Sequence, residues 1–245
     1  MGILIEKIKT WRIFNSGIIK KIKDFIYFKI ISPRKEGKTD KYRKEIMDII
    51  YQVFDNKKWI LSCGSFLRFY RDKTMVKQDI DIFLYEEDLE ELKEKLTNQG
   101  FGIKTRFYDN EGKITEYKYL YKGVEIDFFI VRQDDEGKDY MIFTMEDRGN
   151  DLKVSKKVEN ECIIVTGEDY KSWKRYISDF EKITTYEFEG FKFNGPEYAE
   201  KHIVELYGEN WKVYDPNYDP RYAPENNMPI PGKNAKAIIY LKEEK

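Results

Sequence analysis

The chain has little of several residue types that build common functional sites. Only two of its 245 residues are cysteine, Cys63 and Cys162, and they lie far apart, which argues against a structural zinc site and a disulfide framework and favours a reducing compartment. His202 is the only histidine, which argues against a histidine-rich metal site and a Ser-His-Asp triad. Lysine plus arginine number 44 and aspartate plus glutamate 45, so no overall basic field favours non-specific binding to nucleic acid.

Long apolar runs are also missing. No stretch approaches the roughly 20 apolar residues of a membrane-spanning helix, and no pattern of a cleaved signal is present. Residues 1–38 instead place apolar side chains, such as Ile18, Ile22 and Ile26, at helical spacing among many lysines. We expect a basic amphipathic helical segment that ends in a linker at residues 32–39. Its apolar face either packs on the domain or makes peripheral contact with an anionic membrane. We expect the protein in the cytoplasm or at the surface of that membrane.

The remaining sequence is typical of one globular domain. Hydrophobic residues make up 41% and aromatic residues 16% of the chain, which is enough to fill a sizeable core. Helical and strand-like patterns are mixed, so we expect an α/β or α+β fold with a mixed sheet flanked by helices. The domain is expected at residues 39–225 and a C-terminal tail at residues 226–245. Predicted helices cover residues 40–54, 65–71, 86–99 and 197–206, and predicted strands cover residues 59–63, 79–84, 103–108, 115–121 and 124–132.

Two of the predicted strands carry aspartates on one face. Side chains alternate along a strand, so in residues 79–82 the two aspartates point one way and the two isoleucines point the other way. The same alternation in residues 124–130 separates Asp127 from its apolar neighbours. Carboxylate oxygens are the preferred ligands of Mg²⁺, with Mn²⁺ as the alternative. Asp79, Asp81 and Asp127 are therefore predicted metal ligands and catalytic residues, with two ions expected roughly 3.5 to 4 Å apart.

A Gly-Ser turn precedes these aspartates. Gly64 lets the backbone approach a phosphate closely, and a helix predicted to begin near Ser65 offers free N–H groups and the positive end of its dipole. We expect Gly64 and Ser65 to bind phosphate oxygens, and Arg68, Arg71 and Lys77 to neutralise further phosphate charge. An Asp-x-Asp pair alone is common on solvated strand edges, but this ordered combination is typical of phosphate chemistry on a nucleotide.

The same residues resemble a known protein family. Residues 63–68, Arg71 and residues 79–82 are similar to the Gly-Ser/Thr-Leu-Leu-x-x-x-Arg and Asp-x-Asp signature of the LicD/fukutin family, a branch of the nucleotidyltransferase superfamily. Two positions depart from that signature. Cys63 replaces a usual glycine, and residues 76–78, Val-Lys-Gln, stand where the family often has Trp-Asp.

A second similarity to this family lies far downstream. Residues 188–196, then Tyr198, then residues 206–211 resemble its C-terminal element, which combines a Phe-Glu-Gly strand, a proline-started helix and a Tyr-Gly-x-x-Trp end. The resemblance therefore brackets about residues 40 to 220, with two matched ends in the right order.

The resemblance implies a nucleotidyltransferase-type fold and a phosphotransferase. Such an enzyme moves an alcohol phosphate from a CDP-linked donor, such as CDP-choline or CDP-ribitol, to a sugar hydroxyl of a glycan and releases CMP. The expected acceptors include lipid-linked glycans, and nucleic acid is not an expected partner. Asp127 is the expected proton acceptor, and His202 is expected to be structural or solvated. Two alternatives stay open: a nucleotidyltransferase that attaches a nucleoside monophosphate to a small molecule, protein or RNA, and a non-catalytic nucleotide- or glycan-binding protein.

Overall fold

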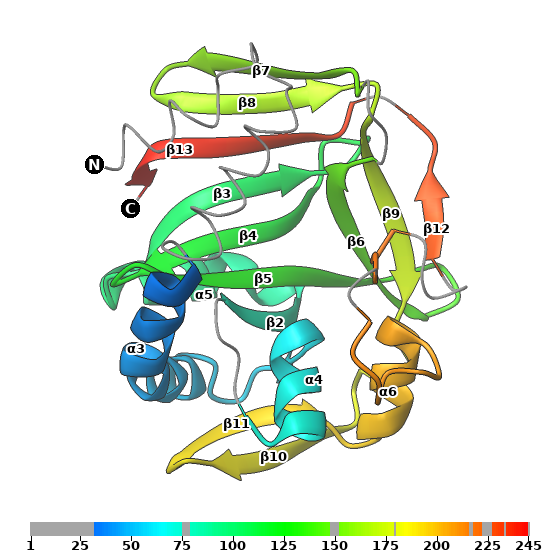
Figure 1. Cartoon of the computed structure of the whole chain (residues 1–245). Helices are drawn as coiled ribbons and strands as arrows, with labels where there is room; N and C mark the ends of the chain where they lie inside the picture. The colour runs from blue at the N-terminus through cyan, green and yellow to red at the C-terminus, as the bar shows by residue number, and fades with distance from the viewer. Residues whose placement is uncertain are drawn as a thin grey trace.

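The computed structural model describes residues 32–74, 79–147, 152–178, 180–215, 218–221, 227–232 and 234–244. Most of the predicted amphipathic segment, residues 1–31, and the predicted phosphate ligand Lys77 lie outside these described residues. Within them the chain is α+β: eleven strands form one mixed sheet, two more form a separate hairpin, and four α-helices pack beside them (Figure 1). The α+β class expected from the sequence is confirmed.

The large sheet brings together strands from the whole described chain. Its order is β12-β9-β6-β5-β4-β3-β13-β8-β7, while β2 pairs with β5 and β1 pairs with β2. The pairing of β2 with β5 is parallel, whereas the other pairings recorded among the described strands are antiparallel. The strands are β1 Trp59–Leu61, β2 Asp79–Tyr85, β3 Gly102–Tyr108, β4 Ile114–Tyr121, β5 Val124–Gln133, β6 Asp139–Glu146, β7 Val154–Glu159, β8 Cys162–Gly167, β9 Tyr170–Tyr176, β12 Asn227–Ile230 and β13 Lys236–Glu244.

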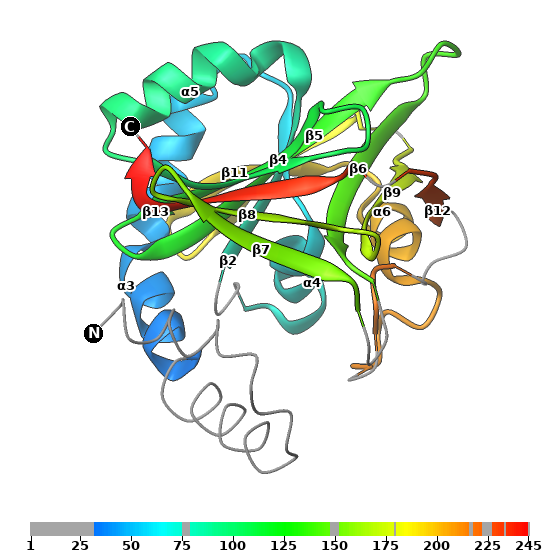
Figure 2. The same cartoon turned by 90° about the horizontal axis from the view of Figure 1, so that it is seen from above.

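The helices lie beside the part of the sheet that contains β2 and β5. Figure 1 shows α3, α4 and the β10–β11 hairpin on the same side of β5, and in Figure 2 α6 lies near β9 and β12. Helix α5 ends just before Gly100, whose φ of 90° suits glycine at a helix end, as the sequence predicts. The helices are α3 Ser32–Val53, α4 Cys63–Asp72, α5 Leu89–Asn98 after the 3₁₀ turn Glu86–Asp88, and α6 Ala199–Tyr207, and the hairpin strands are β10 Ile183–Phe188 and β11 Phe191–Pro196.

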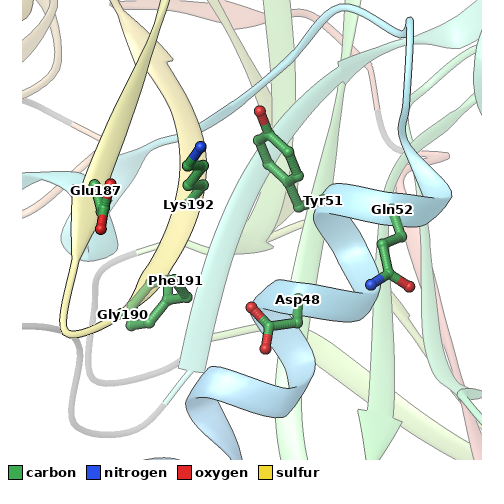
Figure 3. A pocket seen from close by; sticks show the side chains of 7 residues that line it. All are labelled: Asp48, Tyr51, Gln52, Glu187, Gly190, Phe191 and Lys192. Atoms are coloured by element: carbon green, nitrogen blue, oxygen red, sulfur yellow. The ribbon is translucent and has the colours of Figure 1, made fainter.

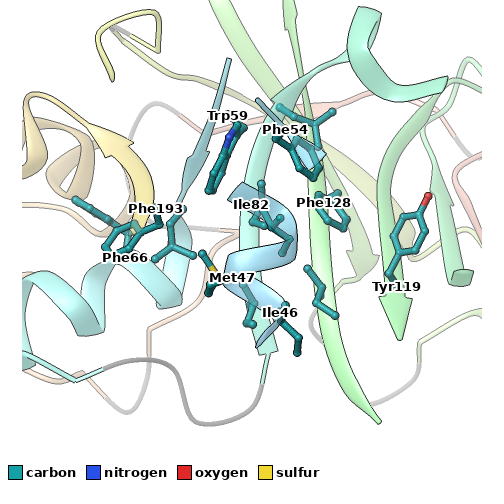
Figure 4. Packing of buried hydrophobic residues seen from close by; sticks show 14 of the residues in the cluster. Ile46, Met47, Phe54, Trp59, Phe66, Ile82, Tyr119, Phe128 and Phe193 are labelled. Atoms are coloured by element: carbon teal, nitrogen blue, oxygen red, sulfur yellow. The ribbon is translucent and has the colours of Figure 1, made fainter. Parts of the chain in front are cut away.

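The main hydrophobic core lies between α3 and strands β2 and β5 (Figure 4). Ile46 and Met47 of α3 are fully buried, and so is Ile82 of β2. Phe128 of β5 stacks on Phe54 with a ring-centroid distance of 5.6 Å. The apolar residues of β2 and β5 therefore face this core, and the alternation that the sequence predicts for both strands is confirmed.

Both ends of the described chain differ from the prediction. The expected linker at residues 32–39 is the first part of α3, and Pro33 is compatible with helix there because its missing N–H falls in the first turn. The expected tail at residues 226–245 contributes β12 and β13, and β13 is an interior strand between β3 and β8. Its Ala237 is buried against Val165 of β8, which explains why this segment is ordered as part of the sheet.

The two stretches that carry the family resemblance contact each other in space. The hairpin packs on α4, with Phe69 4.9 Å from Phe193 and Phe66 5.6 Å from Tyr186 between ring centroids. The turn at Glu189 and Gly190 has positive φ at both residues, which suits a two-residue hairpin loop. The hairpin and α6 therefore hold α4 against β2.

A candidate metal and phosphate site

Three carboxylates converge on the face of the sheet opposite the main core. Asp81 of β2 lies directly beside Asp127 of β5 in the parallel pairing, and Asp79 lies two residues before Asp81 on the same face. One oxygen from each of Asp79, Asp81 and Asp127 lies within 4.8 Å of the other two. Burial, followed by the nearby Asp79 and Asp127 charges, raises the pKa of Asp81 well above its ordinary value. The structure thus brings together the three predicted metal ligands.

The start of α4 holds Asp81 in place. The backbone N–H and the hydroxyl of Ser65 each donate to Asp81 Oδ2 at 3.1 Å, and the backbone N–H of Asp81 donates to Ser65 Oγ at 2.8 Å. Ser65 is fully buried. Its hydroxyl therefore positions a carboxylate, whereas the sequence predicts that it binds a phosphate oxygen. The helix also begins at Cys63, two residues earlier than predicted, so its positive dipole end faces the Asp81 carboxylate.

Gly64 lies beside the acids. A Cβ atom at this position would lie 3.5 Å from Asp81 Oδ2 and 4.0 Å from Tyr207 Oη. Glycine keeps the space between these two side chains open, and Gly64 lines the cavity described below.

Of the predicted basic residues that the structure describes, Arg71 has partners other than the three acids. The Arg71 guanidinium donates to both carboxylate oxygens of Asp72 and, at 3.1 Å, to the backbone carbonyl of Trp211. Arg71 therefore ties α4 to the segment after α6, which differs from its expected role as a phosphate ligand. Arg68 is half-buried on α4 one turn after Gly64.

Strand β4 supplies two site residues that the sequence reasoning missed. Lys118 lies directly opposite Asp127, with its Nζ 2.8 Å from Asp127 Oδ2 and 3.9 Å from Glu125 Oε2. Burial by itself lowers the pKa of Lys118. The nearby carboxylates of Asp127, Glu116 and Glu125 together raise this pKa by a larger amount, so the net shift is upward. Glu116 lies on the same strand face, is 7% exposed, and has a strongly raised pKa, first because of burial and then because of Asp127.

The sequence of β4 contains a pattern that could have identified Glu116 and Lys118 as site residues. Tyr117, Tyr119 and Tyr121 alternate with them and belong to the main core, so Glu116 and Lys118 must point to the opposite face, where the aspartates lie.

The trio fits a hard divalent cation. Asp127 is 5% exposed, and its Oδ1 is buried without a hydrogen-bond partner among the described residues, while Lys118 holds the other oxygen. Burial raises the pKa of Asp127, Lys118 opposes this, and Asp79 adds to it. A buried carboxylate oxygen without a partner is costly unless a cation or a donor compensates it. Three carboxylates are a hard oxygen donor set, which suits Mg²⁺ or Mn²⁺.

A cavity of about 290 Å³ opens beside the trio. Asp81 and Gly64 form one part of its wall, and Glu116, Arg175 and Tyr207 form polar parts of the rest. Its apolar wall comes from β5 and β6 and includes Phe129, Met141, Phe143 and Met145. The volume is near the lower end of the range of small-molecule sites.

A second cavity of about 260 Å³ lies between α3 and the β10–β11 hairpin (Figure 3). Asp48, Tyr51 and Gln52 of α3 line one side, and Glu187 and Lys192 of the hairpin line the other. None of the three aspartates lines it. Of the two cavities, the first is therefore the one that a predicted metal ligand, Asp81, lines.

His202 lies beneath α4, as a structural residue. Its Nε2 lies 2.8 Å from Ser62 Oγ, the residue before α4, and its ring packs edge-on against Phe66. Burial, with a smaller effect of Arg175, lowers the pKa of His202 to about 4.

This burial predicts a pH dependence of stability. Because the folded pKa of about 4 lies below the ordinary 6.5, the unfolded chain binds more protons between these values, and the contribution of neutral His202 is lost as the pH falls through this window. The expected loss from His202 is about 2 to 3 kcal/mol between pH 7 and pH 4.5. Urea unfolding of the wild type and of His202→Gln at both pH values measures it. Equal pH dependence in the two proteins would contradict the assignment.

Comparison with known proteins adds no family assignment. No model of a known protein family matches the chain, and no curated protein is significantly similar to it. Among the described helices none is both long enough and apolar enough to cross a bilayer.

Proposed function

We propose that the protein is a metal-dependent transferase that moves an alcohol phosphate, such as choline or ribitol phosphate, from a CDP-linked donor to a sugar hydroxyl of a glycan and releases CMP. The proposal includes a nucleotidyltransferase-type catalytic core of the LicD/fukutin kind. It also includes a cytoplasmic location, with peripheral contact between the basic N-terminal segment and an anionic membrane, and a glycan acceptor, lipid-linked or free, in place of nucleic acid.

One observation carries this proposal: Asp79, Asp81 and Asp127 converge on one sheet face beside the start of α4, with a buried Asp127 oxygen that has no partner among the described residues. The order of turn, helix, Asp-x-Asp strand and third acid on a neighbouring strand suits phosphoryl transfer from a nucleotide. The contact between α4 and the β10–β11 hairpin adds support, because these are the two stretches that resemble the family.

The residues of the chain have distinct roles in the proposed reaction. Asp79, Asp81 and Asp127 would hold a divalent cation, which would neutralise the negative charge of the donor's diphosphate. Ser65 fixes Asp81 through two hydrogen bonds, and Lys118 fixes Asp127. The acceptor hydroxyl oxygen forms a bond to the phosphorus that carries the alcohol, and the bond from this phosphorus to the bridging oxygen breaks, so that CMP leaves. Asp127 is the proposed acceptor of the hydroxyl proton.

A panel of donors tests the proposal. We expect Mg²⁺- or Mn²⁺-dependent release of CMP from CDP-ribitol, CDP-choline or a related CDP-polyol when oligosaccharide acceptors are present, and much slower hydrolysis without an acceptor. Asp127→Asn should abolish the release. Nucleoside triphosphates should release no pyrophosphate. Pyrophosphate release from a triphosphate, with every CDP-alcohol inert, would instead establish nucleotidyl transfer and contradict the proposal.

A further inference from the structure

Glu116 is a buried carboxyl group that faces the cavity beside the metal ligands. It is 7% exposed, lines the cavity together with Asp81, and lies opposite Phe129 in the pairing of β4 with β5. Within the described part of the chain it has neither a hydrogen bond nor an ion pair. Burying such a group without a partner costs free energy, so the arrangement suits a ligand that brings hydrogen-bond donors into the cavity.

Tyr207 offers a second polar group to the same cavity. Its hydroxyl lies next to Gly64 and Asp81, where a Cβ at Gly64 would be 4.0 Å from Tyr207 Oη. No hydrogen bond of this hydroxyl is found among the described residues, whereas the neighbouring Tyr218 hydroxyl donates to the Leu206 carbonyl at 2.7 Å. A phenol both donates and accepts, so Glu116 and Tyr207 together match groups such as alcohols that also do both.

Three aromatic rings of the cavity wall are already packed on another ring or on Arg175. Phe143 is stacked on Trp173 at 5.6 Å and already has the Arg175 guanidinium over its ring at 5.3 Å. Tyr207 and Tyr218 pack on each other with centroids 4.8 Å apart. A cation binds over ring faces that are not already covered, and Arg175 covers a face of Phe143.

We infer that this cavity takes the alcohol part of the donor and selects an uncharged polyol over a quaternary ammonium alcohol. The inference rests on the proposed function, since the cavity begins at Asp81, where the donor's diphosphate is expected. A polyol esterified to that phosphate extends from Asp81 into the cavity. One of its hydroxyls donates to a carboxyl oxygen of Glu116, another exchanges a hydrogen bond with Tyr207, and its carbon chain contacts Met141 and Met145.

Calorimetric titration of the full chain with Mg²⁺ and three ligands, CDP, CDP-choline and CDP-ribitol, tests this selection. We expect CDP-ribitol to bind about 10-fold or more tighter than CDP, and CDP-choline to bind no tighter than CDP. The ribitol advantage is the ratio of the affinity for CDP-ribitol to the affinity for CDP. Glu116→Met should lower this ratio about 10-fold and Tyr207→Phe about 3- to 10-fold. The affinity for CDP itself should stay unchanged in both variants. Glu187→Met, a strand glutamate outside this cavity, is the matched control and should keep the full advantage.

The outcomes separate this inference from the proposed function. Tighter binding of CDP-choline than of CDP-ribitol overturns the inference and leaves the transferase proposal standing. The same holds if the ribitol advantage survives both substitutions. Failure of all three CDP compounds to bind overturns both. Thermal melts of each variant show whether it is folded, and Tyr207→Phe keeps the ring and its packing, so it reports on the hydroxyl even if Glu116→Met changes stability.

Discussion

Asp81→Asn is expected to lower metal-dependent turnover by about 1,000-fold or more, because a metal ion supplies several kcal/mol of charge stabilisation that depends on its anionic ligands. Asp81 is the central acid of the trio: it pairs with Asp127 across β2 and β5 and lines the cavity. The fold should survive, because asparagine keeps an oxygen that accepts from the backbone N–H and the hydroxyl of Ser65. Without metal the variant should be no less stable than the wild type, since one of three repelling carboxylates is removed.

Steady-state rates of CMP release with and without EDTA measure this effect. Asp135→Asn is the matched control, because Asp135 is exposed in the turn after β5 and lies outside the trio. Its rate should equal that of the wild type. Full turnover by Asp81→Asn in the presence of EDTA would refute the role of this carboxylate as a metal ligand.

Phe128→Ala is expected to destabilise the protein by about 3 to 5 kcal/mol, the usual cost of truncating a fully buried phenylalanine. The ring stacks on Phe54 and packs edge-on against Tyr119 at 5.3 Å. It also follows Asp127 on β5 and faces the opposite side of the sheet, so the substitution loosens the strand that carries the third acid (Figure 4). Metal affinity should therefore fall together with stability.

Urea unfolding measured by circular dichroism checks this cost. Val158→Ala on the outer strand β7 is the control, because Val158 is 65% exposed, and its change should stay within about 0.5 kcal/mol. A loss below about 1 kcal/mol for Phe128→Ala would mean that this core is not packed as described.

The strand face on which each acid lies follows from local sequence alone. Apolar residues alternate with Asp79, Asp81 and Asp127, and a period of two places them on one face of each strand wherever the other face is buried. Only the parallel pairing of β2 with β5, a non-local contact, decides that the two faces adjoin. The sequence pattern suggested this juxtaposition, and the register sets Asp81 beside Asp127.

The role of individual polar side chains was harder to predict. A Gly-Ser turn before a helix suggests a phosphate cradle, but Ser65 turns inward because its hydroxyl and N–H meet Asp81 from a strand 16 residues away. Arg71 is drawn to the Trp211 carbonyl, 140 residues distant. Lys118 joins the site only through its place opposite Asp127. Such partners depend on tertiary pairing, which spacing within a motif does not encode.

The C-terminal strands show the same limit on a larger scale. Residues 236–244 look like a charged tail when taken alone, since lysines and glutamates flank their apolar centre. Their order comes from pairing with β8, at least 72 residues earlier in the chain, and with β3, at least 128 residues earlier. Strand burial of this kind is set by neighbours and not by intrinsic preference.

The central claim is that Asp79, Asp81 and Asp127 bind a divalent cation, and calorimetric titration of Mn²⁺ into the metal-free full chain tests it most directly. The account predicts saturable binding by the wild type and a rise of its melting temperature with Mn²⁺, because a ligand that binds only the folded state stabilises it. It predicts loss of both effects in Asp81→Asn and Asp127→Asn, and their retention in Asp135→Asn. Absence of binding by the folded wild type, or equal binding by all four proteins, would contradict it.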